Sequence, residues 1–78
     1  MANVTIYSTP TCPWCHRTKD FLKEKKIEFK DVDVSNDRDA ANEMIEKSGQ
    51  MGVPVIDIDG KIFVGFDKDG ISRALNIS

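Results

Sequence analysis

Apolar and polar residues recur with two different periods along the chain, and the first two segments show both. Val4-Thr5-Ile6-Tyr7 is rich in β-branched and aromatic residues, which predicts a short strand. From Pro13 to about Lys26 the apolar spacing predicts a helix, and Pro13 suits its first turn, where no backbone N–H is needed. One stripe of this helix carries Cys15, Thr18 and Leu22, with Phe21 beside it.

The middle of the chain predicts a second strand and a second helix. Ile27–Val34 has the alternation of a strand, because its valines alternate with aspartates. Ser35, Asn36 or Asp37 can cap the helix that follows, and Gly49 ends it. The apolar stripe of this helix consists of Ala41, Met44 and Ile45.

The last third predicts a hairpin and a short helix. Val53–Ile58 and Lys61–Val64 are the two strands, and Asp59-Gly60 between them is a strong signal for a tight turn. Asp67 is a candidate cap for the final helix. The apolar residues of that helix are Ile71, Ala74 and Leu75.

These elements follow the order β-α-β-α-β-β-α in a single domain, residues 1–78. A crossover through a helix makes the first two strands parallel, and the hairpin makes the last two antiparallel. We therefore predict an α/β protein with a four-stranded mixed sheet flanked by helices, which is the arrangement of a thioredoxin-like fold. Cys12 and Cys15 then lie at the turn from the first strand to the first helix.

Composition restricts the partners and the compartment. Charged residues make up 31% and hydrophobic residues 40% of the chain, as in ordinary globular domains, and the net charge of −2 provides no basic field for nucleic acid. No apolar run is long enough to cross a membrane, and the first residues lack the basic and apolar regions of a secretory signal. We expect a cytoplasmic monomer that binds neither nucleic acid nor membranes.

The segment Cys12-Pro13-Trp14-Cys15 has the spacing of a dithiol–disulfide centre. A cytoplasmic cysteine pair is more often catalytic or metal-binding than structural. Cys12 at the helix N-terminus would be stabilised as a thiolate by free N–H groups and the helix dipole. Cys15, about one turn further on, would be more buried and less ionised. Cys12 is therefore the expected exposed nucleophile, and Cys15 the thiol that resolves the mixed disulfide.

Three other interpretations of these cysteines compete. Together with His16 they match the haem-attachment pattern C-x-x-C-H, although that chemistry usually belongs outside the cytosol and a strand-rich chain fits it poorly. A closed zinc site needs about four ligands, so a second subunit would be required. On the same logic, a dimer could share an iron–sulfur cluster through Cys12. His16 is otherwise a partly exposed helix residue, and no metal-ligand set is assigned.

The chain resembles a glutaredoxin over nearly its whole length. The resemblance begins with Met1-Ala2-Asn3-Val4 and Tyr7 and is strongest at Thr11-Cys12-Pro13-Trp14-Cys15-His16-Arg17. Glu43–Gly49 resembles the second helix of the family, and Val53-Pro54 resembles its proline before the third strand. The resemblance implies a thiol–disulfide oxidoreductase.

The same resemblance implies that the Val53-Pro54 bond is cis and lies beside Cys12. Cis bonds are nearly confined to proline, which agrees with this expectation. The Val53 backbone could then pair with an extended substrate, as in strand addition. The simpler alternative is that Pro54 only begins a strand, where proline is tolerated.

Several positions depart from the glutathione-using pattern. Ser8-Thr9-Pro10 stands where glutaredoxins often carry a lysine that holds a glutathione carboxylate, and Trp14 replaces the usual tyrosine or phenylalanine. Trp14 could line the groove or be a surface aromatic packed over the helix. Val64–Asp69 lacks the Gly-Gly pair and looks more like redoxins that serve ribonucleotide reductase and are reduced by thioredoxin reductase. Those proteins carry Ser-Gly-Phe and usually an arginine after the phenylalanine. This chain has Asp67 in the place of that arginine.

The residues before the last helix have two interpretations each. Asp67 could simply cap the helix, or the helix N-terminus could bind a glutathione carboxylate that Asp67 would repel unless Lys68 compensates. Phe66 could belong to the core or face a reductase.

The expected function is reduction of protein or small-molecule disulfides, with no tightly bound cofactor. The electron donor is glutathione or a thioredoxin reductase, and the departures favour poor use of glutathione. Besides the two cysteines, the candidate residues for binding substrate or thiol are Thr11, Pro13, Trp14, Val53, Pro54, Gly65, Phe66 and Asp67.

Overall fold

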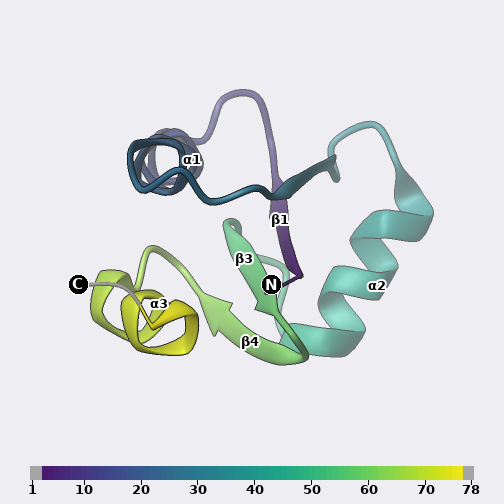
Figure 1. Ribbon diagram of the computed structural model, residues 1–78. Coiled ribbons are helices and arrows are strands. Elements are labelled where there is room, and N and C mark those ends of the chain that lie inside the picture. Colours follow the sequence, from purple (N-terminus) through teal and green to yellow (C-terminus); the bar gives the residue numbers. More distant parts are fainter. Residues whose placement is uncertain (1–2, 77–78) are drawn as a thin grey trace.

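A computed structural model describes residues 3–76, and the predicted order of seven elements is confirmed within them (Figure 1). Met1 and Ala2, which contributed to the family resemblance, lie outside the described residues, as do residues 77–78. The elements are β1 (Val4–Ser8), α1 (Pro13–Glu24), β2 (Lys30–Asp33), α2 (Arg38–Ser48), β3 (Val55–Ile58), β4 (Lys61–Val64) and α3 (Lys68–Leu75).

The strands form one mixed sheet in the order β2-β1-β3-β4. As predicted, β1 and β2 are parallel, with Tyr7 opposite Val32, and β3 and β4 are antiparallel. β1 also pairs antiparallel with β3, with Tyr7 opposite Val55. The chain that leaves β1 and the chain that enters β3 therefore lie at the same end of the sheet.

Helices cover both faces of the sheet, with α1 and α3 on one side and α2 on the other (Figure 1). The core under α1 and α3 consists of Val4, Ile6, Phe21, Leu22, Ile56, Ile58 and Ile71. A smaller cluster under α2 consists of Tyr7, Met44 and Val55. Alternate residues of β1 thus face opposite layers, as the pleat of a strand requires.

Two strands are shorter than the sequence predicts. β2 begins at Lys30 instead of Ile27, because the end of α1 takes up the preceding residues: Lys26 has a positive φ of 59°, and Ile27 N–H bonds to Leu22 O at 2.9 Å. β3 begins at Val55 instead of Val53. Proline has no N–H to give to a strand ladder, which accounts for the later start.

Capping agrees with the local sequence signals. Of the three candidates for the N-cap of α2, Asp37 holds the position and accepts from Ala40 N–H at 3.1 Å. Gly49 ends α2 with φ 74°, and Asp67 caps α3 by accepting from Gly70 N–H at 3.0 Å. Ala40 is the buried alanine of α2 instead of Ala41, which is only half-buried. None of the helices within residues 3–76 is both long and apolar enough to cross a membrane.

Candidate active site

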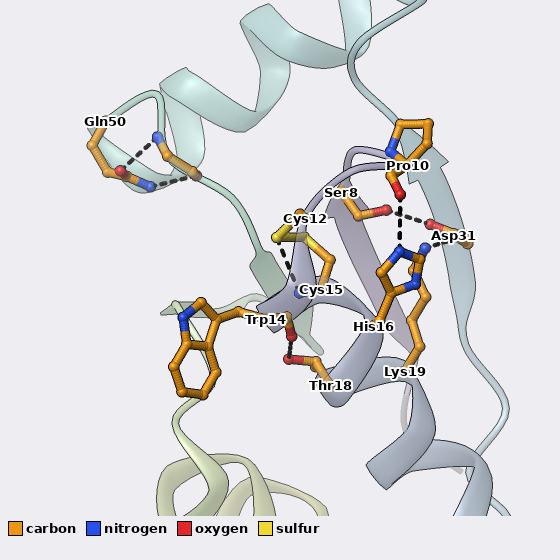
Figure 2. Close-up of a disulfide and its surroundings, with 11 residues drawn as sticks. Ser8, Pro10, Cys12, Trp14, Cys15, His16, Thr18, Lys19, Asp31 and Gln50 are labelled. Carbon is orange, nitrogen blue, oxygen red and sulfur yellow. Dashed lines mark hydrogen bonds and ion pairs between the residues drawn. A yellow bond between two sulfur atoms is a disulfide. The ribbon is translucent and has the colours of Figure 1, made fainter.

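Cys12 and Cys15 lie next to each other at the start of α1 and form a disulfide (Figure 2). Cys12 is the N-cap, with an extended backbone (φ −90°, ψ 111°), and Pro13 is the first helical residue. The two Cα atoms are 5.2 Å apart, a separation that one helical turn provides. The predicted position of the pair is confirmed.

The surroundings of the two sulfur atoms differ. Cys15 is fully buried, whereas Cys12 keeps 9% of its surface accessible. Cys12 is therefore the more accessible cysteine, as expected, but it is much less open than a freely exposed nucleophile. The reason is local: Cys12 Sγ is bonded to Cys15 and also accepts a hydrogen bond from Cys15 N–H at 3.0 Å.

The same hydrogen bond would stabilise the thiolate of reduced Cys12. A thiolate at this position would face a backbone N–H and the positive end of the α1 dipole. The first turn of α1 holds no acidic residue that would oppose the negative charge. Both features favour the thiolate of Cys12, which is the form that attacks disulfides.

A network of polar side chains supports the loop between β1 and Cys12 (Figure 2). Ser8 Oγ donates to Asp31 Oδ1 at 2.8 Å, and Asp31 Oδ2 forms an ion pair with Lys19 Nζ at 2.8 Å. The side chains of Lys19 and Asp31 are 15% and 46% exposed. The network joins the end of β1 to β2 and α1. Sequence reasoning missed it, because Ser8, Lys19 and Asp31 come together only through the fold.

His16 also contacts the active-site loop. Its Nε2 lies 2.9 Å from the carbonyl oxygen of Pro10, and the residue is exposed. This placement agrees with the interpretation of His16 as a helix residue near the cysteines. Within residues 3–76 no cluster of three or more histidine, cysteine or carboxylate side chains is arranged to hold a metal ion.

The Val53-Pro54 peptide bond is cis, as the family resemblance implied. Pro54 is fully buried, and its carbonyl oxygen accepts from Gly65 N–H at 2.8 Å. Continued by one residue, the register of β1 and β3 places Pro54 opposite Ser8. The segment before β3 therefore lies at the end of the sheet from which the loop to Cys12 departs.

Trp14 is a surface aromatic beside the disulfide. Its side chain is 55% exposed, and the Arg17 guanidinium lies 5.0 Å from the ring centroid. The carbonyl oxygen of Trp14 accepts from Thr18 Oγ1 at 2.8 Å. The neighbouring candidates Thr11 and Pro13 are also exposed. Trp14 thus offers an apolar surface to whatever approaches Cys12.

The segment before α3 divides its candidate residues between core and surface. Phe66 is half-buried and packs on Phe21, with ring centroids 5.7 Å apart, which supports its interpretation as a core residue. Gly65 has φ 77°, a conformation that glycine adopts without strain. Asp67 is exposed, and one of its carboxylate oxygens accepts the hydrogen bond that caps α3. The simpler interpretation of Asp67, as a helix cap, therefore matches its geometry.

On the opposite face of the sheet, Lys47 joins α2 to β1 and β3. Its Nζ bonds to Tyr7 Oη at 3.0 Å and to Asp57 Oδ2 at 2.8 Å, and it pairs with Glu43 at 3.1 Å. Burial raises the pKa of Tyr7, although the bond from Lys47 opposes the rise. The bond to Asp57 raises the pKa of Lys47. Burial by itself would raise the pKa of Asp57. The hydrogen bonds from Lys47 and from Gly60 N–H outweigh this effect, so the pKa of Asp57 is lowered.

Comparisons with known proteins agree with this geometry. The family model described as Glutaredoxin matches residues 4–64. An uncharacterized glutaredoxin-like 8.6 kDa protein of the rubredoxin operon of Clostridium pasteurianum is 54% identical over 72 residues, which cover 92% of this chain and 96% of that protein. Glutaredoxin 3 of Escherichia coli strain K12 is 42% identical over 67 residues, with 86% and 81% covered.

A solved structure supports both the fold and the family. The glutaredoxin-like protein NrdH-redoxin from Escherichia coli superposes with a TM-score of 0.82 at 28% identity, over 91% of this chain and 92% of that one. That protein is described as having a thioredoxin-like activity profile. The likeness confirms the thioredoxin-like fold predicted from the order of the elements. With its adjacent cysteines at the start of α1 and a family match over most of its length, this chain belongs to the glutaredoxin family.

Proposed function

We propose that the protein reduces disulfides through Cys12 as nucleophile and Cys15 as resolving thiol. The observation that carries the proposal is the placement of Cys12 at the N-cap of α1, where Cys15 N–H points at its sulfur. Glutaredoxins are thiol–disulfide oxidoreductases, and the chain belongs to that family. A reducing compartment such as the cytoplasm would keep the pair available as thiols.

The reaction proceeds in two exchanges. The Cys12 thiolate attacks one sulfur of the substrate disulfide, the substrate S–S bond breaks, and one substrate thiol leaves after taking a proton from solvent. Cys15 then loses its proton and attacks Cys12 Sγ, which releases the second substrate thiol. The two electrons gained by the substrate come from the two protein thiols, which end as the Cys12–Cys15 disulfide seen in the structure. An external dithiol or thiol donor must restore them.

Protein disulfides suit the surface around the site. The exposed large apolar side chains of the described residues are Trp14, Met51 and Val64. Trp14 follows Cys12 by two residues, Met51 belongs to the loop before Pro54, and Val64 pairs with Val55 next to that proline. All three come from segments at the active-site end of the sheet. A polypeptide substrate would contact them, and its backbone would pair with Val53.

We further propose that glutathione is the poorer of the two candidate electron donors. The carboxylate of Asp67 caps α3 and gives negative charge to the helix end that would otherwise receive a glutathione carboxylate. Ser8, in the stretch where a lysine would help, is buried and bonded to Asp31. The thioredoxin-like activity described for the similar NrdH-redoxin supports a thioredoxin reductase as the donor.

The proposal is tested with two single substitutions that differ only in which sulfur is lost. Reduced Cys12→Ser should fail to release thiol from a disulfide-linked peptide. Reduced Cys15→Ser should stop after the first exchange and accumulate a mixed disulfide with the peptide, which intact-mass spectrometry detects. Full activity of Cys12→Ser would overturn the assignment of the nucleophile.

A further inference from the structure

The loop between α2 and β3 is folded back on itself by one side chain. Gln50 Oε1 accepts from Gly52 N–H at 2.7 Å, and Gln50 Nε2 donates to Gly52 C=O at 2.9 Å (Figure 2). A single side-chain amide thus occupies both backbone groups of Gly52, as a neighbouring strand would. Figure 2 draws this loop among the surroundings of the disulfide, and the loop leads into the cis proline at the active-site end of the sheet.

Gln50 is itself held at the end of α2. Its N–H donates to Ser48 Oγ at 3.4 Å, and its C=O accepts from the same hydroxyl at 2.9 Å. Ser48 Oγ also lies 2.7 Å from the Met44 carbonyl oxygen, which anchors it to the helix. The loop is therefore braced on α2, although it has no regular secondary structure of its own.

Fixing Gly52 also fixes Val53, because the two residues share a peptide unit. The Gly52 C=O and the Val53 N–H belong to one planar trans peptide and point in opposite directions. When Gln50 holds the C=O, the Val53 N–H is directed to the other side. Within residues 3–76 neither the N–H nor the C=O of Val53 takes part in a hydrogen bond. These groups remain available to a ligand.

We propose that Gln50 is a positioning residue that orients the Val53 backbone for pairing with an extended polypeptide next to the reacting disulfide. This inference rests on the proposed function and deepens it, because it makes the substrate class a disulfide within an extended peptide. Gln50 does not touch the reacting atoms. Loss of Gln50 should therefore slow the reduction of peptide disulfides more than the reduction of small disulfides.

Gly52 provides an independent way to break the same contact. A Cβ at this position would lie 2.7 Å from Gln50 Oε1, so the side-chain amide would have to move. Gly52→Ala should therefore displace the Gln50 amide while leaving glutamine in place. If both residues act through one contact, the double variant should be no worse than either single variant.

The experiment compares two substrates with the same leaving group. Reduced wild-type protein, Gln50→Ala, Gly52→Ala and the double variant are mixed in a stopped-flow instrument with two disulfides of 5-thio-2-nitrobenzoate. One disulfide carries a short single-cysteine peptide and the other carries 2-mercaptoethanol. Attack on the carrier sulfur releases the coloured thiolate in both cases. The matched control is Asn42→Ala, which removes another amide from the exposed side of α2.

We expect the ratio of the peptide rate constant to the small-disulfide rate constant to fall about fivefold in each single variant, the order of one net hydrogen bond. The double variant should show the same fall, and Asn42→Ala should show none. An unchanged ratio, or equal losses on both substrates, would overturn the inference while leaving the proposed function intact. Failure of the wild-type protein to release thiolate from either disulfide would overturn the proposed function itself.

Discussion

Cys15 N–H donates a hydrogen bond to the Sγ of Cys12 across 3.0 Å, so the residue proposed to resolve the mixed disulfide also supports the proposed nucleophile. The bond comes from the backbone and is preserved when the Cys15 side chain is changed. The ionisation of Cys12 can therefore be measured in a variant that lacks the Cys15 thiol but keeps this hydrogen bond.

The first prediction concerns the ionisation of reduced Cys12. In Cys15→Ser the pKa of Cys12 should lie well below the ~8.5 of a free cysteine, because the N–H of residue 15 and the α1 dipole favour the thiolate. The pH dependence of iodoacetamide alkylation measures it. A midpoint at or above that of a cysteine in an unfolded peptide would contradict the role given to the helix N-terminus.

The second prediction concerns Asp67 and the electron donor. Asp67→Ser keeps a side chain that can cap α3 but removes the negative charge. In coupled NADPH assays, the wild-type protein should turn over faster with thioredoxin reductase than with glutathione and its reductase. The substitution should raise the glutathione-dependent rate several-fold, because a charge that repels the donor carboxylate is removed. Asp69→Ser, which neutralises a neighbouring carboxylate in the first turn, serves as the control.

If both aspartate variants respond equally, the effect is one of general charge and not of the cap. If the wild-type protein uses glutathione as well as thioredoxin reductase, the proposed donor preference is wrong.

The third prediction concerns the pair Lys19 and Asp31 under the active-site loop. Asp31→Ala should lower the free energy of unfolding by about 1–3 kcal/mol, since it leaves Ser8 and the largely buried Lys19 without their partner. Lys19→Met should cost less, because methionine can replace the buried stem and Asp31 is accessible to water. Urea unfolding of the oxidised proteins measures both values. A larger loss of unfolding free energy in Lys19→Met than in Asp31→Ala would contradict this prediction.

The fourth prediction concerns the pH dependence of stability around Lys47. The lowered pKa of Asp57 contributes stability above its ordinary value of 3.8, and this contribution is lost as the pH falls through the lower folded value. The raised pKa of Lys47 contributes stability below its ordinary value of 10.5, which is lost as the pH rises through the folded value. Tyr7, whose pKa is also raised, acts in the same alkaline range.

Lys47→Met should therefore lower the free energy of unfolding by about 1 kcal/mol at pH 7, the order of one net hydrogen bond. It should also flatten the loss of stability below pH 3.8, because Asp57 loses its partner. Thermal unfolding at several pH values measures both effects. Lys61→Met, at an exposed position of β4, is the matched control. An identical acid profile in the two variants would contradict the assignment to Lys47.

Local patterns predicted the order of the elements, and the predicted start of β2 was wrong because apolar residues there pack on the core without pairing in the sheet. Gly49 and the Asp59-Gly60 turn ended their elements where expected, since their positive φ values of 74°, 51° and 92° are local preferences. Ile27 and Phe29 have the composition of a strand, but they pack against the core from the connection that follows α1. Propensity alone does not distinguish a strand from an apolar connection.

The sequence by itself located the candidate redox centre, because the spacing of Cys12 and Cys15 on one helical turn is a local property. It also determined the order of the elements, through periodicity and turn signals. Only the tertiary structure decided which groups surround that chemistry. The antiparallel pairing of β1 with β3, the contact of Asp31 with Ser8 and Lys19, and the use of Gln50 to hold Gly52 depend on how packed elements meet. Such contacts depend on burial and chain geometry, which residue types alone do not encode position by position.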